Sequence, residues 1–278
     1  MSSAPEVCYR HPDRETRVHC TRCERPICPE CMTAAPVGHH CPTCVAEARK
    51  ETRRIRRPFS RPKSVTIVLL LVNVGVFAVD AVIALFGNRD VLLEAGAMIP
   101  VLIAQGEWWR LITAIFLHIG ILHLAFNSLA LFVFGGLIES ALGSTRMLIL
   151  YLVTGFAASV ASFTFGASGV AAAGASGAIF GLLGAWLVYN LRRRSLSLAR
   201  SNVQSALFLI GINLVFGFTV PGIDNIAHIG GLVSGVLAGF AAEGFGRGPT
   251  RRLTRVGGFL AITVVALVLA VWRISQLS

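Results

Sequence analysis

The sequence has few charged residues, and acidic residues are scarcer than basic ones. Only 14% of its 278 residues are charged, with 14 Asp and Glu against 25 Lys and Arg. Hydrophobic residues make up 54% of the chain, and the mean hydropathy is +0.69. So little charge could not cover the surface of an ordinary soluble domain. The composition therefore favours a protein that crosses a membrane several times.

Two further absences concern the amino-terminal part of the chain. The first sixty residues contain no long apolar run, so we expect no signal peptide. No cysteine follows residue 44, which places all seven cysteines in one short segment. An odd count fits a disulfide framework poorly, and the spacing indicates metal ligands instead. The net charge of +11 comes largely from short arginine blocks between apolar runs, as in cytoplasmic loops, so we expect no nucleic-acid partner.

Four pairs of metal-ligand residues, each separated by two residues, lie in this cysteine-rich segment. They are Cys8 and His11, Cys20 and Cys23, Cys28 and Cys31, and Cys41 and Cys44. This spacing lets one turn present both side chains to a tetrahedral zinc ion, and eight ligands complete two structural sites. A segment this short has little core of its own, so the metal would supply much of its stability.

The pairing of these ligands is open. An interleaved arrangement, first pair with third and second with fourth, resembles B-box and RING modules. A sequential arrangement is also possible, and His39 or His40 could replace one of the last cysteines. Because such modules usually bind proteins, we interpret residues 1–46 as a B-box-like zinc module with a possible cytoplasmic partner. Residues 47–63 form a basic cytoplasmic linker.

Apolar runs of membrane-spanning length dominate the chain from residue 64 onward. Between the first two runs, Trp108, Trp109 and Arg110 suit the membrane interface, where indole rings and guanidinium groups meet lipid headgroups. We predict helices at 65–86, 117–139, 146–166, 176–191, 202–219, 225–243 and 256–273.

The arginines orient these helices. A cytoplasmic amino terminus and seven crossings place the basic loops inside, and the loops 167–175 and 220–224, which lack Lys and Arg, outside. The loop 167–175 is rich in small residues, and we expect water to enter near it. The arginines assigned to the inside are Arg53, Arg54, Arg56, Arg57, Arg192, Arg193, Arg194, Arg200, Arg247, Arg251, Arg252 and Arg255.

Polar residues inside the predicted helices are costly in a membrane and are therefore functional candidates. Ser176 and His228 lie near the outer starts of the fourth and sixth helices. His123 and Asn127 share one face of the second helix. We expect His118 and His123 to lie at the start of that helix. These three helices run in the same direction, so the four side chains share one layer. Asp80 lies near the outer end of the first helix, where we expect it to reach water.

Ser176 has two interpretations, as a small packing residue or as a nucleophile. Glycines at helical spacing on the fourth and sixth helices allow their backbones to approach closely. If they touch, His228 can act as the base for Ser176. The Ser176 N–H, His123 and Asn127 could then stabilise an oxyanion. Asp224 lies one turn before His228, and we favour a dyad without a third member. The glycines are Gly177, Gly181, Gly184, Gly231, Gly235 and Gly239.

With these motifs together, residues 65–245 resemble the rhomboid intramembrane serine proteases. GASG at 174–177 resembles the family's GxSG motif, and AHIGGLVSG at 227–235 its AHxxGxxxG motif. HLAFN at 123–127 is similar to its HxxxN oxyanion motif, and Trp109–Arg110 to its WR pair. Some members carry tyrosine at the position of Phe180, which can stack on the catalytic histidine but cannot donate a hydrogen bond.

The resemblance implies an all-α fold with a six-helix core at residues 64–245, to which residues 246–278 add a loop and a seventh helix. It implies a Ser176–His228 dyad that cleaves transmembrane segments of membrane proteins within the lipid bilayer, with His123 and Asn127 as oxyanion donors. It implies no cofactor for catalysis. Together with the zinc module it suggests a bacterial plasma membrane, and the arginine topology above places the active site near the extracytoplasmic side. An inactive rhomboid-like binder and a transporter with His228 as proton relay are the rival hypotheses.

Overall fold

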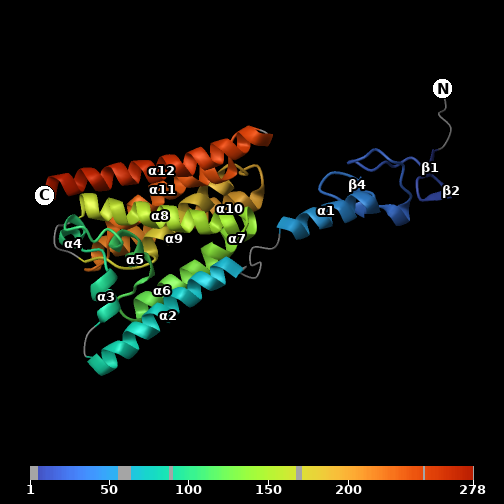
Figure 1. The fold of residues 1–278 in the computed structure, drawn as a ribbon. Coiled ribbons are helices and arrows are strands. Elements are labelled where there is room, and N and C mark those ends of the chain that lie inside the picture. The colour runs from blue at the N-terminus through green and yellow to red at the C-terminus, as the bar shows by residue number, and fades with distance from the viewer. Residues whose placement is uncertain (1–5, 56–63, 88–89, 167–170, 247, 278) are drawn as a thin grey trace. The chain divides into compact units, whose positions relative to one another are not determined.

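A computed structural model describes residues 6–55, 64–87, 90–166, 171–246 and 248–277. The chain divides into two compact units, residues 1–58 and 59–278, and each is described by itself (Figure 1). The expectations for Arg56, Arg57 and Arg247, and for residues 167–170 of the outer loop, lie outside the described residues.

The first unit contains two short hairpins and one helix. Strands β1 (Glu6–Cys8) and β2 (His11–Thr16) pair antiparallel, as do β3 (Thr33–Ala34) and β4 (His39–His40). The 3-10 helix η1 (Pro29–Cys31) and helix α1 (Pro42–Ile55) complete it. The buried side chains around Ile27 are mostly cysteines, so side chains that can ligate metal form most of the core. The strands add a β component that the sequence analysis did not specify.

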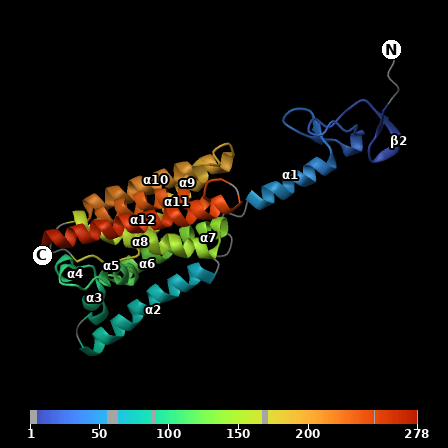
Figure 2. The ribbon, with the colours of Figure 1, turned by 45° about the horizontal axis from the view of Figure 1, so that its top comes forward.

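The second unit is a helical bundle (Figures 1 and 2). Its long helices are α2 (Ser64–Gly87), α6 (Ile121–Ala130) continued by η3 (Leu131–Gly135) and α7 (Gly136–Leu142), α8 (Ser144–Phe165), α9 (Ser176–Leu191), α10 (Ser197–Thr219), α11 (Asn225–Glu243) and α12 (Gly248–Leu277). Among the described residues, six are long and apolar enough to cross a membrane, and α9 is a shorter apolar helix. The expected multi-span helical fold is confirmed.

The observed helix limits match the expected ones most closely at the two helices that carry Ser176 and His228. Helices α9 and α11 begin and end at the expected residues. The second helix was predicted to begin at 117 and instead begins at Ile121, because Gly120 precedes it with φ +82°. His118 therefore lies in the turn before the helix, which corrects the expectation that it opens the helix.

Helix α9 lies in the middle of the bundle and packs against α8, α10 and α11. Glycine makes the α9–α11 contact close enough for backbone to touch backbone. A Cβ atom at Gly184 would lie 2.7 Å from the carbonyl oxygen of Leu232, and one at Gly231 or Gly235 would collide with the α9 backbone. The expected contact between these two helices is therefore present, and its closest points exclude side chains.

The segment between α2 and α6 folds into short helices: α3 (Val91–Gly96), α4 (Pro100–Ala104), α5 (Arg110–Thr113) and η2 (Ala114–Phe116). Its apolar side packs against α8 and α12, where Met98 and Ile103 join Phe163 and Ala266 in one buried cluster. The seventh helix thus supports this first loop.

Arg110 within this loop does not meet lipid headgroups, which corrects the sequence expectation. The indoles of Trp108 and Trp109 are exposed as expected, but Arg110 is only 4% exposed. Its Nε atom donates to Glu107 at 2.7 Å, and its Nη1 atom donates to two backbone carbonyl oxygens at 2.9 Å. Since a buried guanidinium must find acceptors, its role is to hold the loop together.

Two buried carboxylates join segments that are far apart in the sequence. Asp80 on α2 accepts hydrogen bonds from the backbone N–H groups of Leu92 (2.7 Å) and Leu93 (3.2 Å), and so caps α3 instead of reaching water as expected. Glu139 on α7 accepts from the backbone N–H of Thr66 (2.9 Å) and from its hydroxyl (2.6 Å), which ties the start of α2 to the bundle.

Candidate active site and candidate metal centres

Ser176 and His228 meet at the start of the α9–α11 contact. The Ser176 Oγ and His228 Nε2 atoms are 2.9 Å apart, within hydrogen-bond distance. Ser176 is the first residue of α9, and His228 lies one turn into α11 and is 8% exposed. Both helices begin at the same end of the contact, so the close backbone packing sets the distance between the two side chains.

The His228 ring is held by stacking. The Phe180 ring, one turn after Ser176 on α9, lies 4.4 Å from it between centroids, at an interplanar angle of 13°. The Nδ1 atom of His228 has no hydrogen-bond partner in the described part of the chain. Packing against Phe180, with Nδ1 unpartnered, is therefore what orients this imidazole.

Asp224 does not contact His228 Nδ1, and each of its oxygens accepts from another donor. Oδ1 accepts from the backbone N–H of Ala227 at 2.9 Å, which caps α11. Oδ2 accepts from the hydroxyl of Ser162 on α8. The carboxylate therefore anchors the start of the helix that carries His228, consistent with a dyad that lacks a third member.

His123 lies beside the segment that leads to Ser176. A Cβ atom built on Gly174 would lie 2.9 Å from His123 Nε2 and 3.8 Å from Ser176 Oγ, so both side chains border this glycine. The His118 ring packs edge-on against His123 at 5.4 Å. Asn127 is buried, and its Nδ2 atom donates to the carbonyl oxygen of His123 at 3.0 Å. An amide nitrogen has two hydrogens, so one donor remains.

The backbone before Ser176 is joined to the first loop. Met98 and Ala172 exchange two backbone hydrogen bonds, of 2.8 and 2.9 Å, and the N–H of Gly174 donates to Ala114 at 2.9 Å. Gly174 has φ +146°, a conformation that favours glycine. The first loop therefore helps to position the nucleophile candidate.

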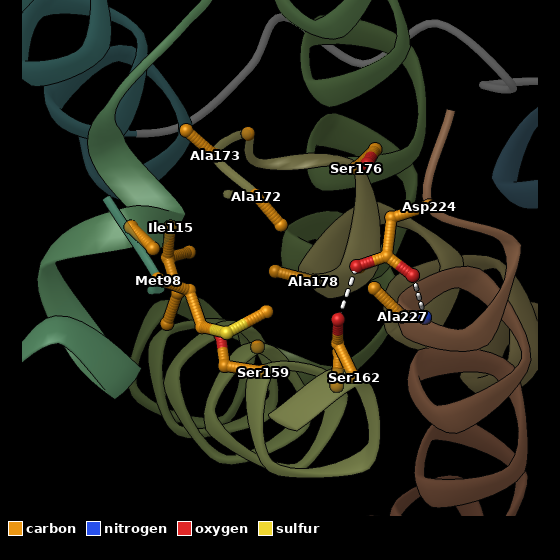
Figure 3. Close-up of a pocket in the computed structure, with 15 residues that line it drawn as sticks. Met98, Ile115, Ser159, Ser162, Ala172, Ala173, Ser176, Ala178, Asp224 and Ala227 are labelled. Atoms are coloured by element: carbon orange, nitrogen blue, oxygen red, sulfur yellow. Dashed lines mark hydrogen bonds between the residues drawn. The ribbon is translucent and has the colours of Figure 1, made fainter. Parts of the chain in front are cut away.

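A small cavity opens beside Ser176 (Figure 3). Its volume is about 40 Å³, and its lining is mostly alanine, glycine and serine, with Met98 and Ile115 on one side. Asp224 and Ser162 lie along another side, joined by their hydrogen bond. A cavity needs roughly 10–15 Å³ to hold a water molecule, so this one can admit the second reactant of a hydrolysis.

The eight predicted metal ligands gather into two groups of four. One group contains Cys8, His11, Cys28 and Cys31, and the other Cys20, Cys23, Cys41 and Cys44; within each, the ligand atoms lie within 4.8 Å of one another. This is the interleaved arrangement. Neither His39 nor His40, which form β4, belongs to a group.

The distances in each group suit zinc. His11 Nδ1 lies 3.8, 3.3 and 3.4 Å from the sulfur atoms of Cys8, Cys28 and Cys31, and the Cys23 and Cys41 sulfurs are 3.7 Å apart. Tetrahedral zinc with the usual bond lengths separates sulfur from nitrogen by about 3.5 Å and sulfur from sulfur by about 3.8 Å. Two such groups could hold zinc, and all four positions of each would be filled by protein.

The thiols of each group differ in acidity. Burial, followed by contacts with neighbouring sulfurs, raises the pKa of Cys31 to about 11 and that of Cys44 to about 12. At Cys8 and Cys20 burial also disfavours the thiolate, but backbone N–H donors together outweigh it and lower the pKa to about 6. A metal ion that binds these groups would therefore displace protons from Cys31 and Cys44.

Several of these positioning contacts were not visible in the sequence. The Asp224–Ser162 hydrogen bond and the Met98–Ala172 backbone pair join residues that are 62 and 74 positions apart. No local pattern marks either pair. The Asp-x-x-Ala spacing before His228 was the one available signal, because aspartate at a helix start commonly caps it.

Comparisons with known proteins agree on one family. A family model described as "Rhomboid domain" matches residues 105–244. "Rhomboid protease GluP" of Bacillus subtilis is 52% identical over 154 residues, which cover 55% of this chain and 30% of GluP. Bacillus subtilis YdcA is 37% identical over 138 residues, covering 50% of this chain and 69% of YdcA. "RHOMBOID-like protein 1" of Arabidopsis thaliana is 39% identical over 159 residues, covering 56% of this chain and 40% of that relative.

Proposed function

The chain belongs to the rhomboid family, and we propose that it is an intramembrane serine protease in which Ser176 is the nucleophile and His228 the general base. The observation that carries the proposal is the 2.9 Å contact between Ser176 Oγ and His228 Nε2. The chain covers less than two thirds of GluP and of RHOMBOID-like protein 1, so their similarity alone does not assign an activity to it.

The reaction needs one proton carrier. His228 Nε2 takes the proton of Ser176 as Oγ attacks the carbonyl carbon of the scissile peptide bond. When the tetrahedral intermediate collapses, the C–N bond breaks and the same nitrogen returns the proton to the leaving amine. A water molecule, admitted through the cavity beside Ser176, then repeats the sequence on the acyl-enzyme and releases the acid.

The negative charge of the intermediate needs hydrogen-bond donors. The backbone N–H of Ser176, at the start of α9, is one of those that a helix leaves unpaired. His123 borders the same segment, and Asn127 keeps one amide hydrogen. We assign the oxyanion to these three donors. Removing one such donor typically costs roughly 100-fold or more in rate.

The substrates are proposed to be transmembrane segments of other membrane proteins. The many arginines at one end of the bundle favour an orientation with that end and the amino terminus in the cytoplasm. Ser176 and His228 both lie near the amino-terminal ends of their helices, α9 and α11, away from the arginine-rich end of the bundle. The active site would therefore open to the extracytoplasmic side of a plasma membrane.

Residues 1–46 are proposed to bind two structural zinc ions in the interleaved arrangement. The two groups of four ligand atoms and their spacing support this assignment. Because no ligand position is left open, the ions would stabilise the fold and take no part in catalysis. Residues 47–63 would link this module to the core at 64–245, and the module would bind a cytoplasmic protein.

The test is cleavage of a model single-span substrate by the purified full chain in proteoliposomes. We expect Ser176→Ala and His228→Ala each to lose at least about 10³-fold in rate, as loss of a nucleophile or its base does. Ser159→Ala is the matched control, since Ser159 lines the same cavity from α8, and it should retain activity.

The dyad assignment fails if all variants cleave at the same rate. If neither the wild type nor any variant cleaves, but the full chain still binds transmembrane segments, the inactive-binder hypothesis replaces it. A fluorophosphonate gives an independent measurement, since it should label the wild type at Ser176 and leave His228→Ala unlabelled.

A further inference from the structure

The ends of α9, α11 and α12 that lie away from Ser176 converge on Glu243. The carboxylate of Glu243 forms an ion pair with Arg192 (3.0 Å) and accepts a hydrogen bond from Arg193 (2.5 Å), both just after α9. Its backbone carbonyl accepts from the Nε atoms of Arg251 (2.8 Å) and Arg255 (3.4 Å), both on α12. We call these five residues the Glu243 cluster.

The cluster carries more positive charge than its own packing needs. Glu243 is 7% exposed, and a buried carboxylate requires one or two cationic partners. Here two arginines pair with the carboxylate and two more bond the backbone carbonyl of the same residue, which gives the cluster a formal charge of +3. Arg146, at the start of α8, adds a further positive charge that acts on Arg255. The carboxyl end of α11 offsets only about half a charge. A structural ion pair would not explain this excess.

The excess is available to a ligand. In the described part of the chain, the terminal nitrogens of Arg192 and Arg251 have no hydrogen-bond acceptor, since only their Nε atoms are engaged. Arg251 is exposed, and the Arg192 side chain is 36% exposed. The contacts with Glu243 engage the Nε atom of each guanidinium, which leaves its two terminal nitrogens as donors. The planar donor forks of arginine match the paired oxygens of a phosphate group.

Apolar and aromatic surface adjoins these arginines. Phe245 is 54% exposed and lies 5.3 Å beneath the Arg192 guanidinium, and Tyr189 lies 3.7 Å beneath that of Arg193. Exposed apolar residues of α12 continue from here along the bundle, including Val256 and Leu260. Aromatic rings between cations and an apolar surface are typical of the level of lipid headgroups. A soluble anion would gain no favourable contact from this apolar surface, whereas the acyl chains of a lipid would.

We propose that the Glu243 cluster is a binding site for the phosphate headgroup of an anionic membrane lipid, with Arg192 and Arg251 contacting the phosphate. Basic pockets between transmembrane helices bind such headgroups by the same chemistry. The lipid would join the ends of α9 and α12 by bridging their guanidinium groups. This site is independent of the proposed protease activity, because it lies at the far ends of the helices that carry Ser176 and His228.

The test counts lipids retained by the purified full chain in native mass spectrometry, after titration with phosphatidylglycerol or with phosphatidylcholine. We expect the wild type to prefer phosphatidylglycerol by about tenfold, the worth of one charge-assisted contact. Arg192→Gln with Arg251→Gln should abolish that preference. The matched control is Arg200→Gln with Arg252→Gln, which removes the same charge from two exposed arginines outside the cluster and should preserve it.

The outcomes are separable. Equal loss of preference in both double variants would show diffuse attraction and overturn the site. Binding of inorganic phosphate alone, with displacement of phosphatidylglycerol, would make the ligand a soluble anion and overturn the lipid assignment. If the glutamine pair does not fold, Arg192→Lys with Arg251→Lys keeps the charge but removes the forks. That variant should lose most of the preference, and an unchanged preference would contradict the proposal.

Discussion

In the first unit the buried side chains are mostly cysteines, whereas between α9 and α11 of the second unit they are glycines and alanines. The first unit brings distant residues together as two groups of four side chains that could each hold one metal ion. The second does so with glycines, which have no side chain and therefore let the two helix backbones touch. A metal-ligand group tolerates substitution of the residues between its ligands but not of the ligands themselves, because only the donor atoms must meet. Backbone contact tolerates no added atom along its whole length.

Removing metal should produce the largest effect and should be confined to the first unit. Structural zinc contributes on the order of 10 kcal/mol per site, so chelation should unfold residues 6–48 and leave the helical bundle intact. Limited proteolysis of the full chain, with metal analysis, measures this. Cys28→Ser should release about one zinc ion, whereas His39→Ala should release none, because His39 lies outside both groups. Equal protection with and without chelator would contradict the comparison.

The same experiment has a pH dependence. The raised pKa values of Cys31 and Cys44 mean that both thiols must lose a proton when metal binds. Zinc retention should therefore fall as the pH falls, by roughly tenfold per unit for each proton displaced. A retention that does not change with pH would show that the sites do not use these cysteines as thiolates.

Adding one methyl group to the α9–α11 contact should produce the next largest effect. In Gly231→Ala the new Cβ would collide with the Gly177 backbone, which must move and take Ser176 with it. We expect a loss of stability of about 1–3 kcal/mol and a fall in cleavage rate of about 100-fold. Gly211→Ala is the control, since nothing lies within 4 Å of a Cβ atom there. Alanine favours a helix more than glycine does, so similar losses in both variants would mean that the α9–α11 contact is not the cause.

Removing the Asp224 carboxylate should have a smaller effect. Asp224→Ala loses the cap of α11 and the bond to Ser162, and should cost about 1 kcal/mol of stability. Ser162→Ala breaks only the second contact and should cost less. Unfolding in mixed micelles measures both. The order of the two variants is the critical result, because a larger loss for Ser162→Ala would place the anchor on α8.

Changing the stacking partner of His228 should have the smallest effect. Phe180→Leu removes an aromatic contact worth about 0.5–1.5 kcal/mol, so the cleavage rate should fall by roughly three- to tenfold. Phe180→Tyr keeps the stacked ring and should cleave at nearly the wild-type rate. A loss as large as that of His228→Ala would mean that Phe180 does more than orient the ring.

The sequence was sufficient for the features that depend on local pattern. The limits of α9 and α11 follow from apolar runs that begin after a small-residue segment and after a capping aspartate. The proximity of these helices follows from glycines at helical spacing. The metal ligands follow from their paired spacing, although interleaved and sequential pairing share that spacing, and only the fold distinguishes them.

The features that the sequence could not predict are polar side chains whose partners are backbone atoms. Arg110 was expected at the headgroups and instead bonds carbonyl groups within its own loop. Asp80 was expected in water and instead caps α3. Every residue offers a carbonyl and nearly every one an N–H, so sequence alone does not show which of them a charged side chain will find.

The paired backbone hydrogen bonds between Met98 and Ala172 provide a way to observe separation of the first loop from the segment before Ser176. Each of these two amide hydrogens is bonded to the carbonyl oxygen of the other residue, so each can exchange with solvent only when the first loop separates from the segment that leads to Ser176. The exchange rate of either amide would then report how often that separation occurs. The frequency of this loop motion could thus be measured from the hydrogen exchange of two backbone amides, without any label or substrate.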